Sequence, residues 1–96
     1  MATPVIFRKL KDRGEIIALF PTVPGTRDPW TCESYMHVGQ HGRASVELFY
    51  DSLPVRGTEY LPLLAELEQL GYDDLRIYRR YQARFTMLRL TELKRA

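Results

Sequence analysis

The sequence predicts an α+β domain in which a mainly antiparallel sheet packs in two layers against one main helix. The first half of the chain holds two pairs of β-rich segments, each pair joined across a glycine-containing turn, and the second half holds a leucine-rich segment with helical spacing. A further β-rich segment follows, giving the order β-β-β-β-α-β with a C-terminal helix after it. The expected elements are a first hairpin over 5–20, a second hairpin over 33–50, a helix over 59–70, a strand over 74–81 and a tail over 82–96.

Length and composition limit the class of protein. With 96 residues, 45% of them hydrophobic, the chain fits a single domain, 1–96, that buries a core without metal or disulfide support. Its single cysteine, Cys32, cannot form an internal disulfide. No run approaches the ~18 apolar residues of a transmembrane helix, and the N-terminus lacks the apolar region of a signal peptide. We therefore expect a cytoplasmic protein with no membrane partner and no cofactor.

The first hairpin is predicted from VIFRKLK (5–11) and EIIALF (15–20), which are rich in β-branched and aromatic residues. Between them lies DRG (12–14). A three-residue hairpin loop ends in a left-handed position, which glycine occupies without a Cβ penalty. This loop opposes Lys11 to Glu15 and sends apolar groups to both faces, so we expect the hairpin to lie well inside the sheet.

The segment PTVPGTRDPWTC, residues 21–32, contains three prolines and a glycine, which predicts an irregular loop because proline fixes φ and cannot donate to a strand ladder. Long irregular loops in compact domains are often functional or mobile. Trp30 is the one large aromatic outside a predicted element. We expect it to plug the edge of the core rather than to wait exposed for a ligand.

The segment ESYMHVG, residues 33–39, alternates with a period of two, which predicts a strand with Met36 and Val38 on the buried side. A three-residue loop over 40–42 then returns the chain into RASVELFY. This register opposes Met36 to Val46 and places the apolar residues of both strands on one face, whereas a two-residue loop mixes the faces.

The segment TEYLPLLAELEQLG predicts the helix over 59–70. Pro62 falls in its first turn, where the missing N–H costs little, and Gly71 sits where a left-handed C-terminal cap is wanted. Glu66 is among the residues expected to face water. The apolar stripe expected to face the core consists of Leu61, Leu64, Ala65, Leu67 and Leu70.

The segment DLRIYRRY, residues 74–81, predicts a strand that returns to the sheet with Leu75 and Ile77 inward. The tail QARFTMLRLTELKRA, residues 82–96, fits neither the helical nor the strand period well. Its helix-forming composition favours a helix over a continued strand.

Three stretches follow one another in a specific order: FRKLKDRGEIIALFP, SYMHVGQHG and EYLPLLAELEQLGYDDLRIYRR. Together they span about residues 6–80, and the sequence resembles a group of short uncharacterised bacterial and phage-borne hypothetical proteins in these stretches, above all in the histidine-containing one. Arg13 departs from the group's pattern and would lengthen the first hairpin loop by one residue, and the tail beyond Tyr81 has no counterpart. No established activity attaches to the group, so the resemblance implies one folded unit and no catalytic role.

The first candidate site is a polar surface or pocket formed by Trp30, Tyr35, His37, His41 and Ser45. On the expected strands, His37 lies beside Tyr35 on the face opposite Met36 and across from Ser45, while His41 is at the tip of the loop. Residues four apart on a strand are separated by about 13 Å, and zinc takes three or four ligands, so we expect no metal site. A flat strand face also lacks oxyanion donors, so we expect no catalytic residue.

The second candidate site is the segment RIYRRYQAR, which interleaves arginines with tyrosines as do proteins that hold single-stranded nucleic acid. In a strand, Arg76, Tyr78 and Arg80 share the outward face. The alternative is a solvated basic edge strand that deters aggregation. The candidate nucleic-acid contacts are Arg76, Tyr78, Arg79, Arg80 and Arg84.

Charge is unevenly distributed along the chain, although the net charge is only +2. Residues 1–14 hold four bases and one acid, residues 15–74 three bases and ten acids, and residues 75–96 seven bases and one acid. If the two basic ends meet, they form one positive surface for nucleic acid or an acidic protein; otherwise they neutralise the acidic middle.

From the sequence we expect a small non-enzymatic binding or accessory module whose partner is unknown. One alternative is nucleic-acid binding through the basic C-terminal segment. The other is a histidine-dependent enzyme or metal site around His37.

Overall fold

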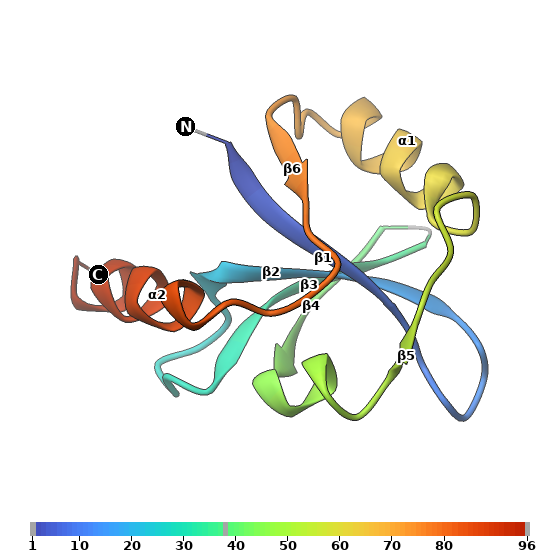
Figure 1. Cartoon of the computed structure of the whole chain (residues 1–96). Coiled ribbons are helices and arrows are strands. Elements are labelled where there is room, and N and C mark those ends of the chain that lie inside the picture. Colours follow the sequence, from blue (N-terminus) through green and yellow to red (C-terminus); the bar gives the residue numbers. More distant parts are fainter. Residues whose placement is uncertain (1, 38, 96) are drawn as a thin grey trace.

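A twisted sheet of six strands, flanked by helices, forms the centre of the molecule, which confirms the α+β prediction (Figure 1). The computed structural model describes residues 2–37 and 39–95. The Cα radius of gyration is 12.5 Å, the value that a single compact unit of this length should have. In the described part of the chain the elements are β1 Thr3–Lys9, β2 Ile16–Pro24, β3 Thr31–Met36, β4 Gln40–Ser45, the 3₁₀ helix η1 Val46–Phe49, β5 Leu53–Pro54, α1 Leu61–Gln69, β6 Leu75–Ile77 and α2 Ala83–Arg95.

Strand β1 joins the two halves of the chain. The order β4-β3-β2-β1 is antiparallel throughout, and two short strands pair with different stretches of β1. β6 pairs in parallel with Thr3–Val5, and β5 pairs antiparallel with Arg8 and Lys9. Phe7 lies between these two stretches, so β5 and β6 meet β1 at different points along its length (Figure 1).

The first hairpin forms as predicted, but its register differs by one residue. Leu10 N donates to the Glu15 carbonyl at 2.8 Å, and Phe7 opposes Ala18. The turn therefore contains four residues, 11–14, and the predicted pairing of Lys11 with Glu15 is wrong. Gly14 does take the left-handed conformation, with φ +71°.

The second hairpin turns earlier than predicted. Tyr35 opposes His41 and Met36 opposes Gln40, so the turn lies before β4, and Gly39 takes the left-handed conformation with φ +74°. The predicted loop over 40–42 is wrong, because the observed register puts Cys32 opposite Ala44 and buries both. The predicted position of Val38 lies outside the described residues.

The strand predicted to run to residue 50 ends at Ser45, and η1 replaces its second half. The Ser45 hydroxyl accepts a hydrogen bond from Glu47 N at 3.2 Å, which caps this short helix. Phe49 is thereby turned into the core.

Helix α1 lies within the predicted range, but its buried face differs from the predicted stripe. Leu63 and Leu67, four residues apart, are buried. Leu61 and Leu70 are about half exposed, and Ala65 is exposed as well. Gly71 has φ +105° and follows the helix as the predicted left-handed residue.

Both faces of the sheet are covered, and the described residues form an apolar cluster on each face. The cluster on the α1 side contains Val5, Phe7, Ala18, Phe20, Tyr35, Leu63 and Leu67. The cluster on the side of η1 and α2 contains Ile6, Ile17, Leu19, Cys32, Ala44, Phe49 and Phe85. The expectation that Tyr35 lies on a polar outward face is therefore wrong, since α1 covers that face.

The proline-rich segment is more regular than predicted, because β2 continues to Pro24 through an irregularity in its pairing with β3 and β3 begins at Thr31. The returning strand is shorter than predicted: β6 covers 75–77 only, and Ile77 is 38% exposed rather than inward. The tail is helical, as predicted, from residue 83 to 95. Within the described ranges, no helix has the length and apolar character needed to cross a bilayer.

Candidate functional site

The five residues of the first candidate site fall into two groups at opposite ends of the β3–β4 hairpin. Tyr35, His37 and His41 gather near the turn, while Ser45 and Trp30 lie at the far end. Ser45 is not across from His37, as the predicted register required, but caps η1. The five side chains therefore do not share one pocket.

Trp30 is 58% exposed, so the expectation that it plugs the core is wrong. Its backbone holds it in place: Trp30 N donates to Asp28 Oδ1 at 2.9 Å, and its carbonyl accepts from Val46 N at 2.9 Å. The fixed backbone presents an indole ring to solvent.

Tyr35 is the centre of the group near the turn. Its hydroxyl donates to Glu66 Oε2 at 2.5 Å and accepts from Gly39 N at 3.0 Å. His37 Nδ1 lies 2.8 Å from Glu66 Oε1, and the ring of His41 meets the Tyr35 ring edge-on at 4.7 Å. The hydrogen bond to Glu66, reinforced by burial, raises the pKa of the Tyr35 phenol.

This arrangement fastens the turn of the β3–β4 hairpin to α1. The expectation that Glu66 faces water is wrong. Its carboxylate accepts a hydrogen bond from the Tyr35 hydroxyl and also contacts His37 Nδ1. No sequence signal marked Glu66, since its role depends on Tyr35 facing α1. The buried Tyr35 hydroxyl already has a donor and an acceptor within the protein, so its role is to stabilise the fold. No group of three or more metal-ligating side chains occurs among residues 2–37 and 39–95.

The second candidate site separates into three places because β6 ends at Ile77. Arg76, Tyr78 and Arg84 come together in a groove. Arg79 lines a different cavity, and Arg80 is exposed and lines neither. The expectation that Arg80 shares a strand face with Arg76 and Tyr78 is therefore wrong.

Tyr78 organises the arginines of the groove. The guanidinium carbons of Arg76 and Arg84 each lie 5.4 Å from the centre of its ring. Arg84 also donates to the Tyr78 hydroxyl at 2.7 Å, and Phe85 packs edge-on against the Tyr78 ring at 5.1 Å. Cation–π contacts of this kind orient two guanidinium groups without neutralising them.

The groove has a volume of about 700 Å³. Its walls are the start of β1, the end of β2, β6 and one side of α2. Arg95 adds a third guanidinium, and the one acid in the lining, Glu92, lies 3.3 Å from it. The lining therefore retains two arginines, Arg76 and Arg84, without a carboxylate partner in the described chain. We call these walls the basic groove.

One buried arginine was not singled out from the sequence. Arg89 of α2 has no exposed surface and donates to the carbonyls of Pro21 (2.8 Å) and Pro29 (3.0 Å) and to the Tyr81 hydroxyl (2.9 Å). Its place on the same helical face as Phe85, four residues earlier, was the available signal. Arg89 holds α2 against the end of β2 and the segment after it, and so positions one wall of the basic groove.

Comparison of the chain with protein-family models, with curated proteins and with solved structures gives no significant match.

Proposed function

We propose that this chain is a small non-enzymatic binding module whose basic groove holds single-stranded nucleic acid. The observation that carries the proposal is the pair of guanidinium groups, Arg76 and Arg84, placed over one tyrosine ring at the wall of a groove of about 700 Å³. Arginine suits this task because its planar fork binds phosphate with two parallel hydrogen bonds and also stacks on flat rings.

Arg84 is held in place before any ligand arrives. The Arg84 guanidinium donates hydrogen bonds to the Tyr78 hydroxyl (2.7 Å) and to Gln82 Oε1 (2.7 Å). A long side chain that is already ordered loses less conformational entropy on binding. The groove is thus prepared to receive phosphates.

The groove also offers surface for bases. Its volume of about 700 Å³ lies within the ~300–1,000 Å³ range of ligand-binding clefts. Leu88, which is 41% exposed, contributes apolar surface beside the arginines. Bases stack on guanidinium planes without regard to sequence, and unpaired bases are free to do so, which favours a single strand over a duplex.

An acidic protein is the competing partner for a positive groove. A flexible acidic segment offers carboxylates but no flat rings, so it would use the charge of Arg76 and Arg84 and leave the stacking surface unused. The cytoplasm, where we place the protein, supplies single-stranded RNA, and the free thiol of Cys32 suits a reducing compartment.

The test is fluorescence anisotropy with a short labelled single strand of mixed sequence at low salt. The Arg76→Ala/Arg84→Ala variant should bind at least tenfold more weakly than the unchanged protein, as expected when charge-assisted hydrogen bonds to two phosphates are lost. The matched control is Arg13→Ala/Arg56→Ala, which removes the same charge from exposed positions outside the groove.

Three results would contradict the proposal: no binding at low salt, equal weakening by the control variant, or equally tight binding of poly-glutamate. The last result would assign the groove to an acidic protein.

A further inference from the structure

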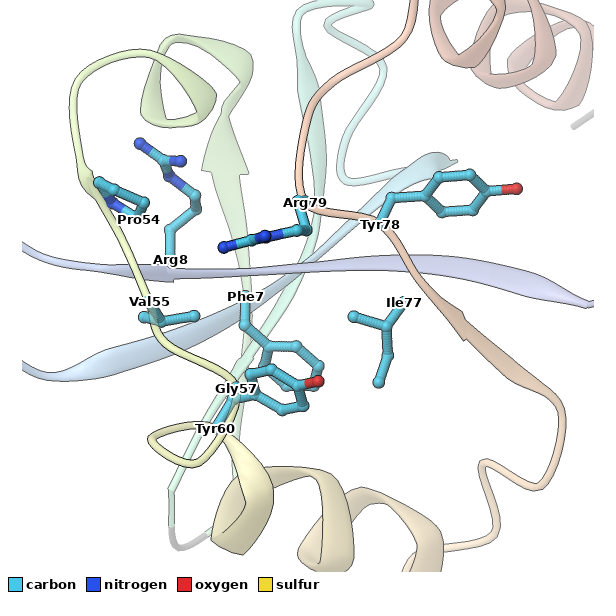
Figure 2. A pocket seen from close by; sticks show the side chains of 9 residues that line it. All are labelled: Phe7, Arg8, Pro54, Val55, Gly57, Tyr60, Ile77, Tyr78 and Arg79. Carbon is cyan, nitrogen blue, oxygen red and sulfur yellow. The ribbon is translucent and has the colours of Figure 1, made fainter.

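A second cavity lies at β1, between the points where β5 and β6 pair with that strand (Figure 2). Its volume is about 290 Å³, near the lower end of the ~300–1,000 Å³ typical of ligand pockets. It is distinct from the basic groove: the two linings have only Tyr78 in common, and the ring of Tyr78 points away from the other labelled side chains (Figure 2).

One half of this cavity is apolar. Phe7 stacks on Tyr60 with ring centres 4.6 Å apart and planes within 7° of parallel. Val55 and Ile77 lie on the same side of the β1 ribbon as these rings (Figure 2). Phe7 belongs to the buried core, so this wall is fixed by the packing of the sheet on α1.

The other half is cationic. Arg8 and Arg79 lie on the opposite side of the β1 ribbon, with the Arg79 guanidinium directed toward the β5 side of the cavity (Figure 2). Arg8 Nε donates to Ser52 Oγ at 2.8 Å, and one of its Nη groups donates to the Ser52 carbonyl at 2.5 Å. These bonds fix Arg8 but supply no negative charge, and burial lowers the pKa of its guanidinium.

Arg79 has neither a hydrogen-bond nor an ion-pair partner within residues 2–37 and 39–95. The cavity lining contains no aspartate or glutamate. The guanidinium groups of Arg8 and Arg79 therefore border a small cavity that has no acidic side chain. Binding of an anion in the cavity would stabilise this arrangement.

From this division into an apolar and a cationic half we infer that the cavity binds a small aromatic carboxylate. The ring would lie against the wall built by Phe7, Tyr60, Val55 and Ile77. The carboxylate would accept hydrogen bonds from the Arg79 guanidinium beside Arg8, in the paired geometry that guanidinium and carboxylate favour. The volume admits one ring with a short acid chain.

Titration of the ¹⁵N-labelled protein with phenylacetate, followed by NMR, tests this inference. Saturable shifts should be centred on the amides of Phe7, Val55, Ile77 and Arg79. Phenylacetamide, which has the same shape without the charge, should bind about tenfold more weakly. Benzylamine, which reverses the charge, should not bind at the same site.

Substitutions separate the role of Arg79 from general charge effects. Arg79→Gln should weaken phenylacetate binding about tenfold, whereas Arg79→Lys should retain part of the affinity. Arg80→Gln is the matched control, because it removes the same charge from the adjacent exposed residue, which does not line the cavity. Arg79 is itself exposed, so its replacement should leave the fold intact.

The inference is overturned if phenylacetate gives no saturable shifts at millimolar concentration, if benzylamine binds equally well, or if Arg79→Gln and Arg80→Gln have equal effects. The Arg76→Ala/Arg84→Ala variant should bind phenylacetate normally. Failure of this inference therefore leaves the nucleic-acid proposal untouched, and the reverse also holds.

Discussion

Arg89 brings a positive charge into the core without an ion-pair partner among the described residues. Backbone carbonyls and one hydroxyl receive its hydrogen bonds, and one of its two terminal nitrogens, Nη2, has no hydrogen-bond partner in the described chain. Such a group is expensive to bury, so its partners must be arranged well for the folded state to tolerate it.

Arg89→Ala should lower the free energy of unfolding by about 3 kcal/mol, because it empties a buried volume and leaves the carbonyls of Pro21 and Pro29 unpaired. Urea denaturation measures this loss. Arg80→Ala, an exposed control, should change stability by less than about 0.5 kcal/mol. A loss below about 1 kcal/mol for Arg89→Ala would show that the buried arginine does not hold α2 in place.

Cys32 couples stability to alkaline pH. Burial, the largest cause, raises the pKa of its thiol from the ordinary 9.0 to about 11. Because the pKa is higher in the folded state, the unfolded chain loses its proton first, and stability that is complete below pH 9 is lost as the pH rises toward 11.

The free energy of unfolding should therefore fall by about 1.4 kcal/mol through Cys32 between pH 7 and pH 10. The pKa values of Tyr35 and Tyr72 are also raised, so Cys32→Ala is needed to isolate the thiol. The stability difference between the unchanged protein and Cys32→Ala should shift by this amount across the pH range. A constant difference would contradict the effect of burial.

At the scale of elements, glycine decides where the second hairpin turns. Gly39 has φ +74°, where a Cβ is disfavoured, whereas a Cβ on Gly42 would meet only Ser34 Oγ at 3.5 Å, an ordinary contact. Gly39→Ala should lower the free energy of unfolding by about 1 kcal/mol, and Gly42→Ala should change it by less than about 0.5 kcal/mol. Chemical denaturation of both variants gives the comparison. A larger loss of stability for Gly42→Ala than for Gly39→Ala would contradict the observed turn and would favour a turn at residues 40–42.

The kind and order of the main elements could be predicted from the sequence, but the strand ends and the strand register could not. An element is predicted from its own residues: the spacing of leucines predicted α1, and the helix-forming composition of the tail predicted α2. Register depends on which glycine turns the chain, and Gly39 and Gly42 both leave plausible alternations of apolar residues. The prediction treated the face of Tyr35 as solvated, because nothing local shows that α1 covers it.

The two candidate sites were predicted with different success because one depended on strand register and the other on composition. The group around His37 was predicted from the wrong register, so Ser45 and Trp30 lie at the other end of the hairpin, while Tyr35, His37 and His41 remain near the turn. The basic segment depended on composition, which register does not alter. Arg76, Tyr78 and Arg84 therefore came together although β6 ended early.

At the scale of the whole molecule, the two basic ends have different fates. Three of the four N-terminal bases are paired with acids of the middle: Lys9 with Glu59 at 2.7 Å, Lys11 with Asp51 at 3.1 Å, and Arg13 with Glu15 at 3.8 Å. The fourth, Arg8, is hydrogen-bonded to Ser52. The C-terminal arginines 76, 79, 80 and 84 have no ion-pair partner in the described ranges. Internal neutralisation thus accounts for most of the N-terminal charge, whereas the C-terminal arginines form a positive surface over β6 and the start of α2.

The salt dependence of oligonucleotide binding decides whether the arginines of the basic groove contact phosphates. If Arg76 and Arg84, which have no carboxylate partner in the groove, each contact a phosphate, a plot of log K against log salt for a single strand should have a slope of about −1.4, since each contact contributes about −0.7. Arg76→Ala/Arg84→Ala should reduce the slope toward zero, and Arg13→Ala/Arg56→Ala should leave it at about −1.4. An unchanged slope in the groove variant, or binding that does not depend on salt, would contradict the assignment of the basic groove to nucleic acid.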